Sequence, residues 1–357
     1  MKKRSPRKAG KLALQAHILD GLRDSVILVN ERREVVGYNR AARELLHLNI
    51  KGLDLALSLP HQRVIEAADA VLSGKPPRTV EVPLSNPIAR TFELHASVLP
   101  AKVPGKAVWA LLVMHDVTET KNAEKIRADF VANVSHELRS PLTSLCGFIE
   151  TLKGVGREDA ESRDWFLGIM EAEAKRMTRL VDDLLSLSRV EAMEHIRPDD
   201  TLAIKHLLRE VVETVSARGR RKGIEVELDC AGSLPAVVGD RDELNEVFHN
   251  LLDNAIKYGR EKTPVRVTAK VSEDFPGLGN EGVSVAVENK GDGIEPQHIP
   301  RLTERFYRVD KGRSREMGGT GLGLAIVKHI VNRHRGHLAI TSAPGEKTVC
   351  TVFLPCA

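Results

Sequence analysis

The stretch "FVANVSHELRSPLTSLCGFIETL" at residues 130–152 decides the fold of the middle of the chain. Its apolar residues recur at steps of three and four, which is the period of a helix with one contact seam. The seam residues are Val131, Val134, Leu138, Leu142, Leu145, Ile149 and Leu152. After a polar break the rhythm returns at Phe166, Met170, Met177, Leu180, Leu184 and Leu187, interrupted by Glu173. A lone hairpin cannot bury this stripe, so the pattern predicts a homodimer built around a four-helix bundle.

His136 within this stretch is a candidate reactive group. It precedes the seam residue Leu138 by two positions, about 200° of helical rotation, so its imidazole is predicted to stand in water. Glu137 follows directly and can orient or deprotonate one ring nitrogen while the other attacks an electrophile. Pro141 removes the hydrogen bond to the carbonyl of Glu137 and is predicted to bend the helix. An idle surface histidine is the alternative at this position.

The patterns on either side of the hairpin predict different domains. Before it, two strands, short helices and three further strands indicate a small α+β sensor-like module. Beyond the predicted hinge at Pro198, Asp199 and Asp200, helices and strands alternate, which predicts an α/β sandwich. The 357 residues are too many for one core. The predicted parts are a basic tail 1–12, a sensor module 13–118, a hairpin 119–198 and a sandwich 199–357.

Composition and charge exclude several classes of protein. A hydrophobic content of 42% is ordinary for a globular chain, and a net charge of +4 gives no reason to expect nucleic-acid binding. The four cysteines show no metal-type pairing and suit a reducing compartment. Without an apolar run of roughly 18 residues or a signal peptide, a cytoplasmic location is expected. Six basic residues among the first eleven have the charge for weak contact with anionic lipid at the inner membrane; a solvated terminus is the alternative.

A second candidate site lies in "HNLLDNAIKYG" at residues 249–259. Asn250 and Asn254 are four apart and share one helix face. The amide oxygen of Asn254 suits a magnesium ion among water and phosphate oxygens. Lys257 offers a cation for phosphate, and Tyr258 offers a ring on which a base can stack. Asparagines that cap the helix or face solvent are the alternative.

Two glycine clusters, "ENKGDGI" at 288–294 and "GGTGLG" at 318–323, form a third candidate site. Glycine permits positive φ and close backbone approach, and the second cluster opens a helix whose N-terminal amides can hold phosphate. Neither cluster is a dinucleotide fingerprint or a Walker loop. Between them lie Arg308, Lys311, Arg313 and Arg315, which predict a mobile lid over a triphosphate. A merely solvated loop is the alternative.

Taken together, these stretches resemble the sensor histidine kinases of two-component systems, in the same order over residues 119–357. The stretch around His136 resembles the phosphoacceptor box. "HNLLDNAIKY", "VENKGDGI", "LTERFYRVD" and "GGTGLGLAIVKHIV" resemble the asparagine, first glycine, phenylalanine and second glycine boxes. Residues 13–118 more loosely resemble a PAS sensor module through "NRAARELL" and "HDVTE". Within the family, the stretch that begins "IPRLTERFYRVDKGRSRE" is most similar to the phosphate-regulon sensor kinases.

The resemblance implies a multidomain α+β protein whose nucleotide domain has the fold shared by gyrase, Hsp90 and MutL ATPases. It implies that ATP with Mg²⁺ phosphorylates His136, that Glu137 acts as base, and that an aspartate on the receiver domain of a response regulator then takes the phosphoryl group, in phosphate-starvation signalling. In the nucleotide site it implies magnesium on Asn254 supported by Asn250, phosphate on Lys257 and Arg308, and adenine beside Tyr258. The glycine boxes place Asn289, Gly291, Gly293, Gly319, Gly321, Leu322 and Gly323 in the same site.

Three departures from the family pattern matter. Asn289 stands where the family has an aspartate that reads adenine, so weaker nucleotide binding is expected. Ser140 stands where threonine or asparagine often orients water for phosphatase action, and its hydroxyl predicts that phosphatase activity survives. The membrane span common in phosphate-regulon kinases is missing, so either the chain is a truncated or naturally soluble form, or the basic tail adjoined an anchor that has been lost.

Two other functions compete with the kinase. The first is a phosphatase or phosphotransfer scaffold with a weak ATP site, which Asn289 would favour. The second is a sister ATPase of the gyrase or Hsp90 kind, which the histidine-bearing helix before the nucleotide domain argues against.

Overall fold

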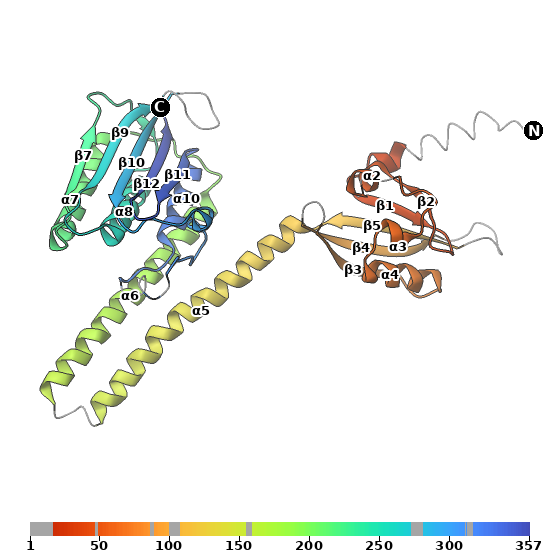
Figure 1. Cartoon of the computed structure of the whole chain (residues 1–357), viewed down its shortest axis with the longest axis horizontal. Coiled ribbons are helices and arrows are strands. Elements are labelled where there is room, and N and C mark those ends of the chain that lie inside the picture. Colours follow the sequence, from red (N-terminus) through yellow and green to blue (C-terminus); the bar gives the residue numbers. More distant parts are fainter. Residues whose placement is uncertain are drawn as a thin grey trace, which may run out of the picture. The chain divides into compact units, whose positions relative to one another are not determined.

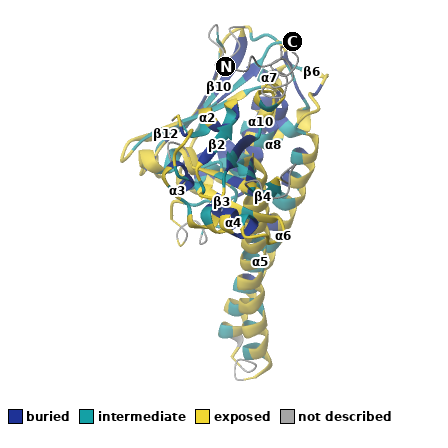
Figure 2. Ribbon diagram, turned by 90° about the vertical axis from the view of Figure 1, so that its right-hand side faces the viewer, coloured by how far each residue is buried: buried dark blue, intermediate teal, exposed yellow. Residues whose placement is uncertain are grey.

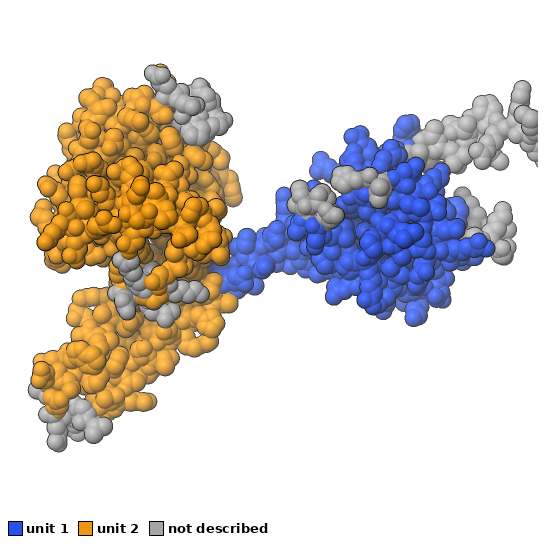
Figure 3. Space-filling model, viewed as in Figure 1, with its two compact units in different colours: residues 1–131 blue, residues 132–357 orange. Residues whose placement is uncertain are grey.

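The computed structural model describes residues 17–46, 49–85, 89–99, 108–154, 159–272, 281–310, 312 and 317–357. The chain separates into two compact units, residues 1–131 and 132–357 (Figure 3). The predicted basic tail at 1–12 and three of the four predicted lid residues, Lys311, Arg313 and Arg315, lie outside the described residues. Within the described part of the chain, no helix carries an apolar run long enough to cross a bilayer.

The first unit is an antiparallel sheet with helices on one face, in strand order β2-β1-β5-β4-β3 (Figure 1). The strands are β1 Ser25–Val29, β2 Val35–Tyr38, β3 Arg78–Leu84, β4 Arg90–Leu99 and β5 Trp109–Asp116. Helices α2 Arg40–Leu46, α3 Leu55–Ser58 and α4 Gln62–Leu72 come between β2 and β3. Alternate strand residues such as Leu94 and Leu112 bury their side chains against Val64 and Val71 of α4. The small α+β module expected from the sequence is therefore present.

Buried Asn39 explains how this module begins. Its side-chain oxygen accepts hydrogen bonds from the N–H groups of Val26 (2.9 Å) and Ala42 (3.0 Å), which joins β1 to the first turn of α2. Its amide group donates to the carbonyls of Leu19 and Asp24. All the hydrogen-bonding capacity of one buried polar side chain is thus used to fix where the helix starts.

The predicted hairpin consists of α5 Thr118–Lys153 and α6 Ala160–Met193. The second unit begins at Ala132, so the first part of α5 belongs to the first unit. The helix α5 continues through Pro141, so the proline does not end it. The side chain of Pro141 is buried. Much of the lower hairpin is exposed or only half-buried (Figure 2). Seam residues Val131, Leu142 and Ile149 are 58%, 52% and 40% exposed in the single chain. An apolar stripe left in water on this scale is the surface that a second copy is predicted to cover.

Glu173, which interrupts the seam, belongs to an ionic cluster between the two helices. Arg176 on α6 is only 7% exposed. Its guanidinium lies 2.7 Å from the carboxylate of Glu137 on α5 and 3.5 Å from that of Glu173. A buried arginine needs such partners, because an unpaired charge in this position is costly. The polar residue in the seam is therefore explained by Arg176.

The rest of the second unit is an α/β sandwich, which we call the α/β lobe, residues 199–357. Its five-stranded sheet has the order β11-β12-β10-β9-β7, with only β7 and β9 parallel. The strands are β7 Val226–Cys230, β9 Val265–Ser272, β10 Gly282–Lys290, β11 His337–Ala343 and β12 Lys347–Pro355. Helices α7 Ile204–Arg221, α8 Arg241–Tyr258 and α10 Gly323–Arg333 pack side by side over one face of this sheet (Figure 1).

The helices of the α/β lobe form where the sequence predicts them, because their apolar residues follow the helical period. In α8, Leu244, Val247, Leu251 and Ala255 are buried, while the acceptor side chain of Asp240 caps the first turn. Two elements were not predicted. They are the short ribbon of β6 Thr201–Leu202 with β8 Val237–Val238 and the 3-10 helix η2 Pro296–Arg301.

The predicted hinge after α6 is held by many contacts. Pro198 is buried. The guanidinium of Arg333 on α10 donates to the carbonyl of Ile196, and the carbonyl of Asp200 accepts from the N–H of Gly239 at 2.8 Å. The connection between hairpin and α/β lobe is therefore anchored to the lobe at Ile196, Pro198 and Asp200, while most of its side chains are exposed.

Buried His334 at the end of α10 joins three parts of the α/β lobe. Its Nε2 accepts a hydrogen bond from the N–H of Asp240 at 3.0 Å, and its Nδ1 donates to the carbonyl of Ile330 at 2.8 Å. A Cβ at Gly239 would lie 2.7 Å from the ring, which explains the glycine. Burial lowers the pKa of His334, so the neutral imidazole is the form that fits.

This geometry predicts that acid weakens the α/β lobe at the start of α8. A histidine whose folded pKa is depressed stabilises the fold fully above its unfolded pKa, about 6.5, and loses that contribution as the pH falls below it. We expect faster hydrogen exchange at the first turn of α8 at pH 5.5 than at pH 7.5, after correction for intrinsic rates.

The control for this prediction separates His334 from its charged neighbours Glu243, Arg333, Asp240 and Arg197. Burial raises the pKa of Glu243, which acts in the opposite sense. His334→Gln, which cannot take up a proton, should lose most of the pH dependence, whereas His337→Gln at an exposed site should keep it. An unchanged pH dependence in His334→Gln would contradict the assignment.

Candidate functional site

A cavity of about 530 Å³ lies in the second unit between α8, the sheet and the glycine-rich segment before α10. Ten residues that the sequence assigned to a nucleotide site line it: Asn250, Asn254, Lys257, Tyr258, Asn289, Gly293, Arg308, Gly319, Gly321 and Gly323. Residues from stretches up to about seventy positions apart in sequence thus meet around one space. Gly291 and Leu322 are not among the lining residues.

One wall of the cavity is the polar face of α8. Asn250, Asn254 and Lys257 share this face because of their helical spacing, while the opposite face is buried. Asn250 also approaches the start of α10, where a Cβ at Gly323 would lie 2.9 Å from its amide oxygen. Lys257 is 10% exposed and lies 3.7 Å from Asp253, and burial lowers the pKa of its ammonium. This wall offers amide oxygens and a cation.

The glycines around the cavity meet backbone or close side-chain neighbours. Gly321 has φ +77° and lies so near Phe306 that a Cβ would be 3.0 Å from its backbone, while the N–H of Phe306 donates to the carbonyl of Gly321 at 2.8 Å. A Cβ at Gly291 would be 2.6 Å from the carbonyl of Tyr258. Leu322 is fully buried at the start of α10. Gly291 and Leu322 therefore support the cavity from outside it.

At its sheet end the cavity is lined by apolar strand residues and by two polar ones. Val287, Ile340 and Cys350 line it, and burial raises the pKa of the Cys350 thiol to about 12, so this thiol is neutral. Asn289 and Thr348 face the same end, since they are register partners on β10 and β12. An apolar slot with two hydrogen-bonding groups suits the flat ring of a base.

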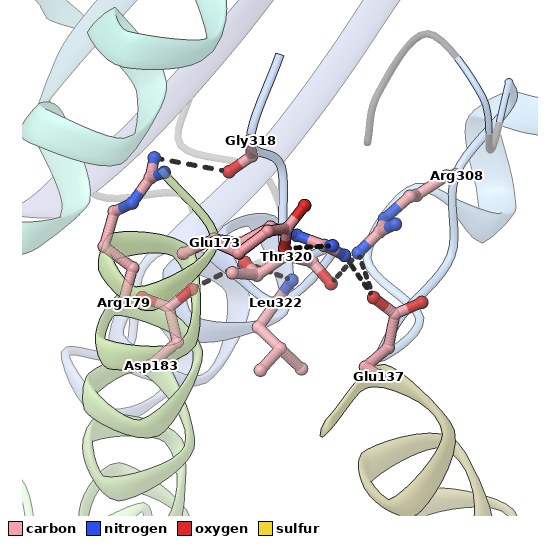
Figure 4. Close-up of polar contacts among 9 residues, drawn as sticks. Glu137, Glu173, Arg179, Asp183, Arg308, Gly318, Thr320 and Leu322 are labelled. Atoms are coloured by element: carbon pink, nitrogen blue, oxygen red, sulfur yellow. Dashed lines mark hydrogen bonds and ion pairs between the residues drawn. The ribbon is translucent and has the colours of Figure 1, made fainter. Parts of the chain in front are cut away.

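The three predicted residues of the helix α5 lie apart from the cavity lining. His136 and Ser140 are exposed, as expected for a group that must meet other molecules. The carboxylate of Glu137 accepts a hydrogen bond from Arg176 at 2.7 Å. It accepts another from Arg308 at 3.2 Å (Figure 4). In this arrangement two guanidinium groups occupy the carboxylate of Glu137.

Two residues of α6 that the sequence reasoning missed also line the cavity. The guanidinium of Arg179 donates to the carbonyl of Gly318 at 3.3 Å, and the hydroxyl of Thr320 donates to the carboxylate of Asp183 at 2.6 Å (Figure 4). Burial raises the pKa of Asp183. A signal was present, because Arg176, Arg179 and Asp183 follow the seam rhythm one position earlier.

The arrangement has the two ends that a nucleoside triphosphate requires. The glycine-rich turn, Lys257 and Arg308 provide close backbone approach and positive charge for phosphates, and the apolar slot provides a surface for the base. The amide oxygen of Asn254, between these ends, is a hard neutral ligand of the kind that magnesium accepts beside water and phosphate oxygens. The residues present therefore fit magnesium bound together with the nucleotide.

Comparison with known proteins decides the family. Residues 126–192 match the model of the His Kinase A (phospho-acceptor) domain, and residues 239–357 match the model of the histidine kinase-, DNA gyrase B- and HSP90-like ATPase. The phosphate regulon sensor protein PhoR of Pseudomonas aeruginosa is 37% identical over 337 residues, 92% of this chain and 71% of that protein. The chain belongs to the sensor histidine kinases. It is PhoR-like, and it is an ATP-dependent protein histidine kinase.

Other relatives of this sensor histidine kinase are more distant. The sensor histidine kinase WalK of Bacillus subtilis is 30% identical over 352 residues, and the chain spans 95% of its own length but 55% of that protein. Among solved structures, the histidine kinase ThkA in complex with the response regulator protein TrrA has a TM-score of 0.51 at 22% identity. That match covers 95% of this chain and 98% of ThkA, and it supports the fold alone.

The position of Asp183 predicts how the kinase binds nucleotide. A carboxylate on the cavity wall repels a triphosphate and also holds Thr320. We expect Asp183→Asn to tighten binding of Mg-ATP by about three- to tenfold, measured by titration calorimetry. Asp182→Asn removes the same charge from an exposed neighbouring site and should leave the affinity unchanged. Equal affinities of Asp183→Asn and the unaltered kinase would contradict this role.

Proposed function

We propose that this sensor histidine kinase phosphorylates His136 from ATP and passes the phosphoryl group to an aspartate on the receiver domain of a response regulator, in phosphate-starvation signalling. The observation that carries the proposal is an exposed histidine on the hairpin in the same unit as a cavity suited to a nucleoside triphosphate. Similarity to PhoR over 92% of the chain supports the phosphate-regulon role.

The chemistry asked of the protein is mainly positioning. A ring nitrogen of His136 attacks the γ-phosphorus, the bond to the β-phosphate oxygen breaks, and ADP leaves. Glu137 takes the proton of the other ring nitrogen. Lys257 and Arg308 offset the negative charge of the phosphates, and Asn250 supports the site beside Asn254 on the same face of α8. Magnesium, held by Asn254 together with the nucleotide, would supply further charge neutralisation.

The contacts between hairpin and α/β lobe describe a state that precedes this reaction. Arg308 donates both to Glu137 at 3.2 Å and to the carbonyl of Thr320 at 2.7 Å, and it is 4% exposed on its side chain. Glu137, the proposed base, and Arg308, the proposed phosphate-binding residue, thus form an ion pair with each other. Catalysis requires the lobe to release Glu137, so this ion pair restrains the kinase until the lobe moves.

The proposal assigns two further roles. The hairpin forms a homodimer, which the exposure of the α5 seam residues Val131, Leu142 and Ile149 supports; on α6, Leu180 and Leu187 are already buried within the single chain. The α+β module at residues 13–118 acts as a PAS-like sensor domain, which its antiparallel sheet and single helical layer support. Contact of the basic tail with anionic lipid stays a prediction from the sequence.

A second function has one observation in its favour. Asn289 offers the base a neutral amide at a site 8% exposed, where the family has a charged carboxylate. A weak ATP site would leave a protein that acts mainly as a phosphatase of its regulator or as a phosphotransfer scaffold. The rate of autophosphorylation separates the two functions.

Incubation of the full chain with γ-labelled ATP and magnesium should label the protein through a phosphoramidate, stable to base and labile to acid. His136→Gln should abolish the label, a fall of at least about a hundredfold, because no other group replaces the nucleophile. His95→Gln, at an exposed site in the first unit, is the matched control and should label normally. Undiminished labelling of His136→Gln would refute the assignment.

Ser140→Ala tests phosphatase action separately. Without its hydroxyl, the residue four positions after His136 cannot orient an attacking water, so we expect dephosphorylation of the regulator to slow by about ten- to a hundredfold. Autophosphorylation should persist. The exposed Ser144, one turn further along α5, provides the control Ser144→Ala. The assignment fails if Ser140→Ala dephosphorylates the regulator as fast as the unaltered kinase.

A further inference from the structure

Asn289 and Thr348 are two neighbouring side chains with hydrogen-bonding groups at the sheet end of the cavity. They are opposite one another on β10 and β12, both line the cavity, and Asn289 is 8% exposed. The amide nitrogen of Asn289 has a long hydrogen bond of 3.5 Å to the carbonyl of Lys290. Such a bond is at the limit of the range and fixes the orientation of the amide only weakly.

An asparagine amide can reverse its hydrogen-bonding role. Its oxygen accepts and its nitrogen donates, so a rotation of about 180° exchanges the group presented to a ligand. A carboxylate in the same place accepts only. The residue at position 289 therefore determines whether the cavity can bind a ligand that presents a hydrogen-bond acceptor there.

The hydroxyl of Thr348 can also reverse its role. It lies 2.7 Å from the hydroxyl of Ser342, and either of the two can be the donor. The Ser342 oxygen accepts from the N–H of Ile294 at 2.9 Å, and its hydrogen has a second acceptor in the carbonyl of Lys347 at 3.1 Å. When Ser342 donates to Lys347, Thr348 donates to Ser342 and presents lone pairs to the cavity. When Ser342 donates to Thr348, the hydrogen of Thr348 is available to the cavity.

Purine bases differ in the same pair of groups. Adenine presents an amino donor at C6 and an acceptor at N1, whereas a 6-oxopurine presents an oxygen acceptor at C6 and an N1–H donor. We infer that Asn289 and Thr348 together allow this site to bind 6-oxopurine nucleoside triphosphates, GTP among them, as well as ATP. The inference rests on the proposed nucleotide site. It assigns to Asn289 a broadened base selectivity rather than only a weakened affinity.

The test measures binding of ATP, ITP and GTP to the full chain with magnesium, by calorimetry, for the unaltered protein and for Asn289→Asp. ITP carries the 6-oxo group without the 2-amino group of guanine, so it isolates recognition at C6. We expect ITP and GTP to bind the unaltered protein within about tenfold of ATP. In Asn289→Asp the ratio of ITP to ATP affinity should fall by about 10- to 100-fold, because two acceptors then face each other.

Controls make each outcome decisive. Asn245→Asp adds the same charge at an exposed position of α8 outside the cavity lining and should keep the unaltered ratio. ATP binding by Asn289→Asp shows that the variant is folded. If the unaltered protein binds ATP but rejects ITP, the inference is overturned and the proposed site stands. If ATP itself does not bind, the proposed site fails. If ITP binds and GTP does not, recognition of the 6-oxo group is supported and the part of the inference that concerns GTP is overturned.

Discussion

The second unit depends on the carboxylate of Glu137, which lies between two guanidinium groups. Arg176 brings it to α6, and Arg308 brings it to the α/β lobe, so one side chain on α5 connects three parts of the unit. All three side chains are largely removed from water, with exposed fractions of 17%, 9% and 4%. Loss of either arginine would leave the Glu137 carboxylate with one of its two charge partners. The interaction therefore fixes how α5, α6 and the lobe meet in this structure.

In the cavity, too, a few close contacts set the positions of the lining residues. Asn250 fits against the start of α10 only because residue 323 has no Cβ, and Gly321 accepts the backbone of Phe306 for the same reason. Close approaches of this kind fix the glycine-rich turn relative to α8. The wall of the cavity formed by α8 and the glycine-rich turn are consequently held close together, while Arg308 and Thr320 also contact the hairpin.

The sequence predicted most elements because their patterns are periodic. The alternation of helices and strands beyond the hairpin was expected from these patterns and is present, and the exposure of His136 followed from its rotation relative to Leu138. Contacts between elements were beyond its reach. Nothing in the spacing of Glu137 and Arg308 indicates an ion pair across 171 positions. Arg179 and Asp183 were missed because polar residues on a helix are usually solvated, and their regular spacing beside the seam does not show which element they contact.

The short ribbon of β6 with β8 escaped prediction because two residues per strand carry no recognisable alternation. The hydrogen bond between Asp183 and Thr320 was not predicted either, because nothing in the sequence around each residue indicates that the two meet.

Helix α6 carries two registers that differ by a single residue. Leu180, Leu184 and Leu187 belong to the predicted dimer seam, while Arg179, Asp183 and Ser186, each one position earlier, contact the α/β lobe. One residue corresponds to about 100° around the helix axis. A rotation of α6 about its axis turns both sets of residues by the same angle. A rotation imposed on the predicted dimer seam therefore also moves the residues that contact Gly318 and Thr320 at the cavity.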